Sequence, residues 1–109
     1  MESVTAGPAE LELDVVPEDA VVIDLRSRAA YQSWHWPGAL WLDFAHAAAA
    51  YPKFDPLRSY LVYCEFGLKS AHLAELMRKS GLRAHNFRGG LRRLVAHALA
   101  RGLPGPQLP

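Results

Sequence analysis

The sequence has little of several things, and each shortage excludes a class of protein. It contains one cysteine among 109 residues, which excludes an internal disulfide and a Cys-x-x-Cys redox pair. Its formal net charge is only +1, so the basic excess of a nucleic-acid-binding domain is missing. No apolar run is long enough to span a membrane, and no charged-then-apolar signal peptide opens the chain. We therefore expect a cytoplasmic protein with no nucleic-acid or membrane partner, in a compartment that keeps its thiol reduced.

What is present is typical of a folded domain, since 50% of the residues are apolar and 21% are charged. We predict a single domain over residues 1–109, with residues 1–8 and 103–109 as flexible tails. The run Val21–Ile23 is β-branched and lacks polar alternation, which indicates a strand buried on both faces of a parallel sheet. Strand patterns alternate with helical patterns along the chain. This alternation predicts an α/β fold with a central, mostly parallel sheet and helices on both faces.

The expected elements follow from apolar periodicity and from capping residues. Strands are expected at residues 11–16, 21–23, 40–42, 60–63 and 83–87, and a last helix at 91–100. Three further helices are expected to begin at caps whose side chains accept a backbone N–H bond, namely Ser27, Asp43 and Ser70. The first of these helices runs to Ser33, the second through the alanine run to Tyr51, and the third ends at Gly81.

The only cysteine, Cys64, lies between a strand pattern and a helix pattern. In open parallel sheets, ligands bind at the carboxyl ends of the strands. This thiol is therefore expected at that edge of the sheet. Loop N–H groups and the positive end of the following helix converge near such a sulfur, and they stabilise a thiolate or an anion bound to it. Gly67 permits a positive φ in the loop, and Lys69 adds a cation. The alternative is an ordinary strand-to-helix turn around an unreactive buried cysteine.

Three stretches, in this order and at this spacing, resemble one family. The first combines Val22–Arg26 with His35–Ala39, the second is the loop Cys64–Ser70, and the third is Phe87–Gly90. Together they span residues 21 to 90 and resemble a single-domain rhodanese, a sulfurtransferase fold. The loop is also similar to that of the rhodanese domains fused to thiouridine and thiazole synthesis enzymes. The resemblance implies a rhodanese-like fold for the whole domain.

The resemblance further implies that Cys64 is the catalytic nucleophile. Its thiolate is expected to carry sulfane sulfur as a persulfide from a donor to a thiophilic acceptor, in two half-reactions. The donor would be thiosulfate, a small sulfur-containing anion, or a protein persulfide, and the acceptor a thiol or a sulfur-carrier protein. No cofactor and no metal are expected. The loop residues expected to bind substrate are Glu65, Phe66, Gly67, Leu68, Lys69 and Ser70. The expected supporting residues are Asp24, Arg26, His35 and Arg88.

Two loop residues depart from the family's thiosulfate enzymes. Glu65 follows the cysteine directly, and its carboxylate repels thiosulfate. Lys69 stands where those enzymes often have arginine, and lysine cannot hold a sulfonate in a bidentate manner. We therefore predict weak thiosulfate activity and a persulfidated protein as the better donor.

Other functions are compatible with the same fold. One alternative is a non-catalytic rhodanese-like binding or regulatory module in which Cys64 is incidental. Another is a phosphatase of this fold, which would carry Cys-x5-Arg. Here Ser70 occupies that arginine position, so the shorter loop favours sulfur. A redox sensor would need a resolving cysteine, which the chain lacks.

Overall fold

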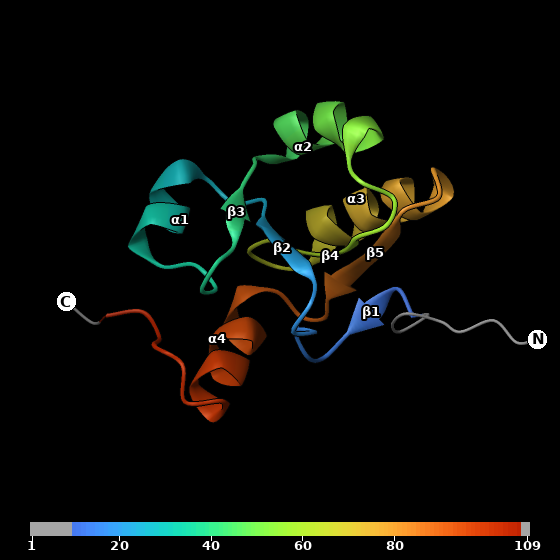
Figure 1. Ribbon diagram of the computed structural model, residues 1–109. Helices are drawn as coiled ribbons and strands as arrows, with labels where there is room; N and C mark the ends of the chain where they lie inside the picture. Colours follow the sequence, from blue (N-terminus) through green and yellow to red (C-terminus); the bar gives the residue numbers. More distant parts are fainter. Residues whose placement is uncertain (1–9, 108–109) are drawn as a thin grey trace, which may run out of the picture.

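A computed structural model describes residues 10–107 of the chain (Figure 1). The tail expected at residues 1–8 lies outside the described residues, as do residues 108 and 109 of the other expected tail. Elsewhere in that second stretch, Leu103 packs against the core, and the carbonyl of Pro104 accepts a hydrogen bond from Trp34 Nε1 at 3.0 Å. Within residues 10–107, no helix has the length and apolar character needed to cross a bilayer.

Among the described residues, five strands form one sheet, and every pairing between them is parallel. The spatial order is β1-β5-β4-β2-β3. The strands are β1 (Glu12–Leu13), β2 (Val21–Asp24), β3 (Leu40–Trp41), β4 (Ser59–Tyr63) and β5 (Arg83–Phe87). The prediction of an α/β fold with a parallel sheet is confirmed. The first strand is shorter than the expected 11–16, because it pairs only with the last two residues of β5.

Helices cover both faces of the sheet (Figure 1). They are α1 (Arg28–Ser33), α2 (Phe44–Ala50), α3 (Leu68–Lys79) and α4 (Leu91–Ala100), with a 3-10 turn at Tyr51–Lys53. One core lies between the sheet and α2 and α3, and the other lies between the sheet and α4, with α1 at its border. Alternate residues of β4 enter the two cores: Val62 faces α3, whereas Leu61 and Tyr63 face α4. This two-sided burial explains the continuous apolar run of the strand.

Two of the three expected caps are confirmed. Ser27 Oγ accepts the N–H of Ala30 at 3.2 Å, and Asp43 Oδ1 accepts the N–H of His46 at 2.9 Å. The prediction that Ser70 caps α3 is wrong. Helix α3 begins at Leu68, directly after Gly67, whose φ of +86° turns the chain into the helix. Ser70 is therefore a buried residue of the first turn, and its hydroxyl points to the cysteine instead of the backbone.

The register of the strands brings three turns to one edge of the sheet. Asp24 is paired with Tyr63, and Val62 is paired with Asn86. The residues that follow β2, β4 and β5 therefore meet at the same edge, which is the edge where ligands bind in open parallel sheets. Cys64 is the first residue after β4.

Candidate active site

The sulfur of Cys64 lies in a cradle of hydrogen-bond donors built by the start of α3. The backbone N–H of Gly67 donates to Sγ at 3.2 Å, and that of Ser70 donates at 3.4 Å. Ser70 Oγ lies 3.2 Å from the same sulfur. Only 6% of Cys64 is exposed, so few water molecules compete for these bonds. Two backbone N–H donors at the start of a helix are therefore directed at this sulfur, an arrangement that suits a bound anion.

A pair of glycines after β5, Gly89 and Gly90, packs against the loop of Cys64. Gly90 has a φ of +78°, and its backbone lies so close to the loop that an added Cβ would come within 2.4 Å of the carbonyl oxygen of Glu65. The N–H of Leu91 donates to that carbonyl at 2.9 Å. A Cβ added to Gly67 would in turn lie 3.2 Å from the nitrogen of Gly90. The turn at residues 89–90 and the loop of Cys64 therefore fix each other's shape.

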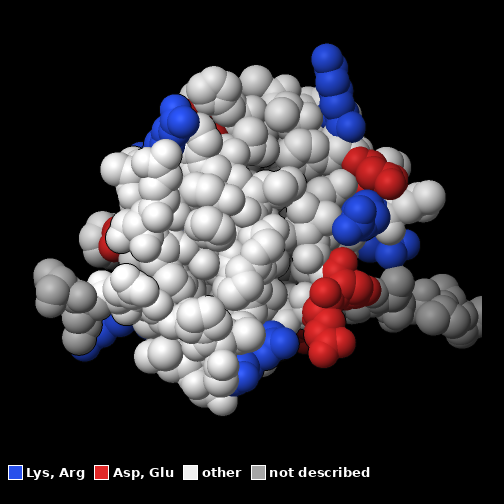
Figure 2. All heavy atoms as spheres, turned by 60° about the vertical axis from the view of Figure 1, so that its left-hand side comes forward, with Lys and Arg blue, Asp and Glu red and all other residues white. Residues whose placement is uncertain are grey.

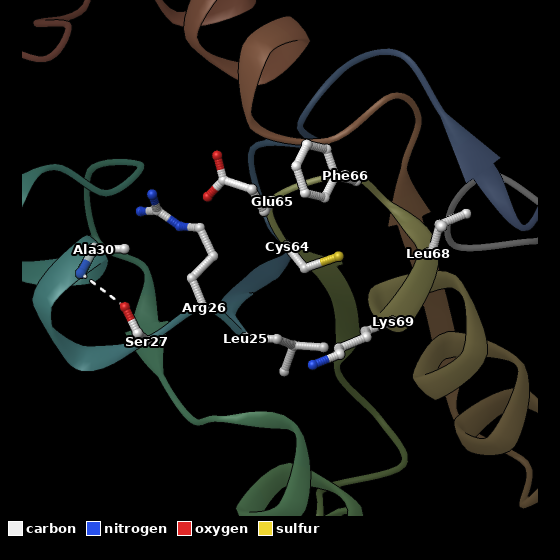
Figure 3. A pocket seen from close by; sticks show the side chains of 9 residues that line it. All are labelled: Leu25, Arg26, Ser27, Ala30, Cys64, Glu65, Phe66, Leu68 and Lys69. Carbon is white, nitrogen blue, oxygen red and sulfur yellow. Dashed lines mark hydrogen bonds between the residues drawn. The ribbon is translucent and has the colours of Figure 1, made fainter.

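Cys64 opens onto a cavity of about 420 Å³ (Figure 3). Figure 3 shows Arg26 and Lys69 on different sides of Cys64, with Arg26 coming from the turn after β2 and Lys69 from α3. Phe66 lies on the loop side of the same opening. The lining residues are Leu25, Arg26, Ser27, Ala30, Cys64, Glu65, Phe66, Leu68 and Lys69. The cavity thus combines an apolar wall with two cations and one carboxylate around the sulfur.

Arg26 is held in the cavity wall by a buried carboxylate. Asp24 is fully buried, and its two carboxylate oxygens accept bonds from Arg26 Nε at 3.1 Å and from Nη2 at 2.8 Å. The backbone N–H of Arg26 donates to the same carboxylate at 2.9 Å. Tyr63 Oη also donates to it, at 2.7 Å. Burial, together with the hydrogen bond to Asp24, raises the pKa of Tyr63 above its ordinary value, so the phenol stays protonated and keeps donating.

Two of the expected supporting residues lie away from the cavity. His35 Nδ1 makes a bond of 2.8 Å with the carbonyl of Tyr31, and its ring stacks on the Tyr31 ring with centroids 3.8 Å apart. Arg88 Nε donates to Asp14 at 2.9 Å in an exposed ion pair, a kind of pair that adds little stability. Neither side chain lines the opening at Cys64. Of the four expected supporting residues, the structure brings only Asp24 and Arg26 to the site.

Sequence reasoning missed one buried residue that touches the loop. Asn86 is 1% exposed, and its Nδ2 donates to the carbonyl of Gly67 at 3.2 Å. The available signal was an asparagine, a residue type depleted in strands, inside the expected strand 83–87. Burial of its amide there is unfavourable without a hydrogen-bond partner. Ser27 and Ala30 were also missed as cavity wall, because only the tertiary packing of α1 brings them there. Within residues 10–107, no cluster of three or more His, Cys, Asp or Glu side chains could hold a metal ion.

Comparison with known families identifies the fold independently of the site. The sequence model of the family described as rhodanese-like domain matches residues 8–97 of this chain. The chain belongs to the rhodanese-like family. Among solved structures, this rhodanese-like domain is similar to a rhodanese-related protein from Thermoplasma volcanium, with a TM-score of 0.66, 18% identity, and coverage of 80% of this chain and 83% of that one. It is also similar to the human single-domain sulfurtransferase TSTD1, with a TM-score of 0.61, 20% identity, and coverage of 72% and 82%. These two similarities concern the fold alone.

Curated relatives of this rhodanese-like domain are of two kinds. A tRNA sulfurtransferase of Pyrobaculum aerophilum is 37% identical over 81 residues, which is 74% of this chain but 17% of that protein. The chain therefore spans only about a sixth of the length of that relative. A thiosulfate sulfurtransferase GlpE of Coxiella burnetii is 30% identical over 84 residues, which is 76% of this chain and 78% of that protein.

Proposed function

We propose that this rhodanese-like domain is a sulfurtransferase that carries sulfane sulfur as a persulfide on Cys64. The observation that carries the proposal is the cradle: one sulfur receives two backbone N–H bonds at the mouth of a cavity of about 420 Å³. Such a cradle stabilises a sulfur anion as an oxyanion hole stabilises a developing oxyanion. Membership of the rhodanese-like family, and the sulfurtransferase names of its relatives, support the same chemistry.

In the first half-reaction, the Cys64 thiolate attacks the sulfane sulfur of the donor. A bond forms between Sγ and that sulfur, and the sulfur–sulfur bond of the donor breaks. With thiosulfate, the electron pair of the broken bond leaves with sulfite. With a protein persulfide, the electron pair leaves with the donor's thiolate. That thiolate then takes up the proton that the transferred sulfur carried. No external oxidant or reductant is needed, because the transferred sulfur keeps its oxidation state throughout.

In the second half-reaction, a thiophilic acceptor attacks the terminal sulfur of the persulfide. The new bond forms between the acceptor and that sulfur, and the Cys64 thiolate leaves with the electron pair of the bond that breaks. The N–H groups of Gly67 and Ser70 then stabilise the leaving thiolate, as they stabilised the attacking one. The enzyme returns to its starting state, so ping-pong kinetics are expected.

The charges around the cavity favour a protein donor over thiosulfate. Arg26, Glu65 and Lys69 all line the cavity, but the charge of Arg26 is compensated by its ion pair with buried Asp24. The negative charge of Glu65 therefore offsets the attraction of Lys69 for a small dianion. Phe66 and Leu68 are each 77% exposed on the reactive loop, and exposed apolar side chains beside a reactive thiol suit contact with another protein. The proposed donor is a persulfidated protein, and the proposed acceptor is a thiol or a sulfur-carrier protein.

The surface around α1 agrees with such a partner. Figure 2 shows the side that lies at the left in Figure 1, where charged side chains lie toward the edges and most of the centre is uncharged. A weakly charged face suits a protein partner better than a nucleic acid, whose phosphates need a dense basic surface.

The test is the intact mass of the protein after incubation with thiosulfate, or with a persulfidated thiol peptide, and removal of the donor. We expect a gain of one sulfur atom in the wild type and no gain in Cys64→Ser. The gain should be faster with the persulfidated peptide than with thiosulfate. No gain with any donor would instead support a non-catalytic binding module.

A further inference from the structure

Asn86 connects the cradle of Cys64 to β1, the outermost strand of the sheet. Its Nδ2 donates to the carbonyl of Gly67 at 3.2 Å and to Glu12 Oε1 at 2.8 Å. The N–H of the same Gly67 donates to the sulfur at 3.2 Å. A chain of three hydrogen bonds therefore runs from Glu12, on the edge strand β1, through Asn86 to the sulfur. We propose that Asn86 is a positioning residue that holds Gly67 in the conformation that stabilises sulfur on Cys64.

Gly67 is the residue of the cradle whose backbone conformation most needs to be restrained. Its φ is +86° and its ψ is 1°, and glycine has the widest range of accessible backbone conformations. Rotation about its backbone would move the N–H that binds the sulfur. The Asn86 bond fixes the peptide that follows Gly67, and the turn at Gly90 also lies close against the loop. Because the peptide group is planar and trans, fixing its carbonyl also fixes the direction of the Leu68 N–H at the start of α3.

The environment of Asn86 indicates that packing alone does not explain it. The residue is 1% exposed, and the neighbouring Val62 and Ala84 on the same face of the sheet are apolar. Its Oδ1 is buried and has no hydrogen-bond partner among the described residues. An unpartnered buried acceptor destabilises a fold, so an apolar side chain would suit this position better if packing were its only role.

The orientation of the amide is set by its partners. If Oδ1 and Nδ2 exchanged places, the oxygen would face two acceptors, the carbonyl of Gly67 and the carboxylate of Glu12. The donor must therefore face the loop. What the position supplies is one N–H directed at Gly67, and this is the group that a positioning residue needs.

The inference rests on the proposed function, and its test separates the two. The first readout is hydrogen exchange of the Gly67 amide, followed by NMR, which does not depend on activity. The second is the rate of sulfur transfer from the isolated persulfide form to cyanide. For Asn86→Leu, we expect exchange to become about tenfold faster and transfer to become about tenfold slower, as for one lost hydrogen bond of ordinary strength. The thermal midpoint should change by less than about 5 °C, because the unpartnered Oδ1 is removed as well.

His85→Leu is the matched control. Like Asn86→Leu, this substitution replaces a polar residue of β5 by leucine. It also removes a hydrogen bond to a residue near β1, because His85 bonds the carbonyl of Glu10. Its side chain does not bond the loop, so exchange at Gly67 should stay at the wild-type rate. Asn86→Ala serves as the second variant should Asn86→Leu fail to fold.

Equal Gly67 exchange in the Asn86 and His85 variants would overturn the inference, as would unchanged transfer in a folded Asn86 variant. A wild type that never takes up sulfur would instead refute the proposed function. The exchange measurement would then still decide whether Asn86 holds Gly67.

Discussion

Gly90 is the position where one added methyl group tests how the loop is supported. Its φ of +78° and ψ of −161° lie in a region that residues with a Cβ rarely adopt. A Cβ there would lie 2.4 Å from the carbonyl oxygen of Glu65 and 2.8 Å from backbone atoms of Phe66. Because these atoms are backbone, they can move only if the whole loop of Cys64 moves. Gly90→Ala is therefore expected to displace the cradle as well as to strain its own backbone.

Two contributions set the size of the effect. The strained backbone costs about 1–3 kcal/mol, and overpacking against the loop costs about 1–3 kcal/mol more. The free energy of unfolding should therefore fall by about 2–6 kcal/mol in Gly90→Ala. Gly38→Ala is the matched control, because Gly38 has a φ of +84° but no atom of residues 10–107 lies within 4 Å of an added Cβ. It should lose only the strain, about 1–3 kcal/mol.

Equilibrium unfolding in urea measures both losses, provided that the slopes of the transitions agree with the wild type. Sulfur transfer is then measured under conditions where both variants are folded. We expect Gly90→Ala to lose more transfer activity than Gly38→Ala. Equal losses of free energy in the two variants would refute the steric argument, and wild-type transfer by folded Gly90→Ala would refute the link between this turn and the cradle.

Three further predictions concern charge and hydrogen bonding. Glu65→Gln should raise kcat/KM for thiosulfate by about two- to fivefold at low salt and less at high salt; an unchanged value would contradict the prediction that Glu65 weakens the use of thiosulfate. Tyr63→Phe should lower the free energy of unfolding in urea by about 1–3 kcal/mol, because buried Asp24 loses a donor; a smaller loss would mean that the donor is replaced. Burial, together with nearby Arg101, lowers the pKa of His97 below its ordinary value, so the unfolded chain binds more protons. Stability should be full above about pH 6.5 and should fall as the pH drops toward the lowered value, a dependence that His97→Gln should lack in urea titrations.

Much of the fold follows from local signals in the sequence. The apolar run of β4 and the β-branched run of β2 predict a parallel sheet, and the side chains of Ser27 and Asp43 cap the helices that follow them. These features depend on neighbours in the chain. The position of Cys64 after a central strand also followed from the alternation of strands and helices, and the structure places β4 at the centre of the sheet.

What the sequence could not predict depends on contacts between distant residues. Ser70 has the side chain of a cap, but Gly67 turns the chain into the helix earlier and leaves Ser70 facing the sulfur. The contacts of Asn86 with Glu12 and Gly67 depend on the pairing of β5 with β1 and β4, which a single sequence does not specify. Arg26 reaches the cavity because Asp24 holds it there, a geometry that the spacing of the two residues alone does not fix.

The most direct test of the central claim follows one sulfur atom on and off Cys64. The protein is loaded with a sulfane donor, freed of it and weighed intact, then treated with cyanide and weighed again. We expect a gain of one sulfur atom, followed by its complete loss with one thiocyanate released per protein molecule. A mass that never changes, or a gain that also occurs in Cys64→Ser, would contradict it.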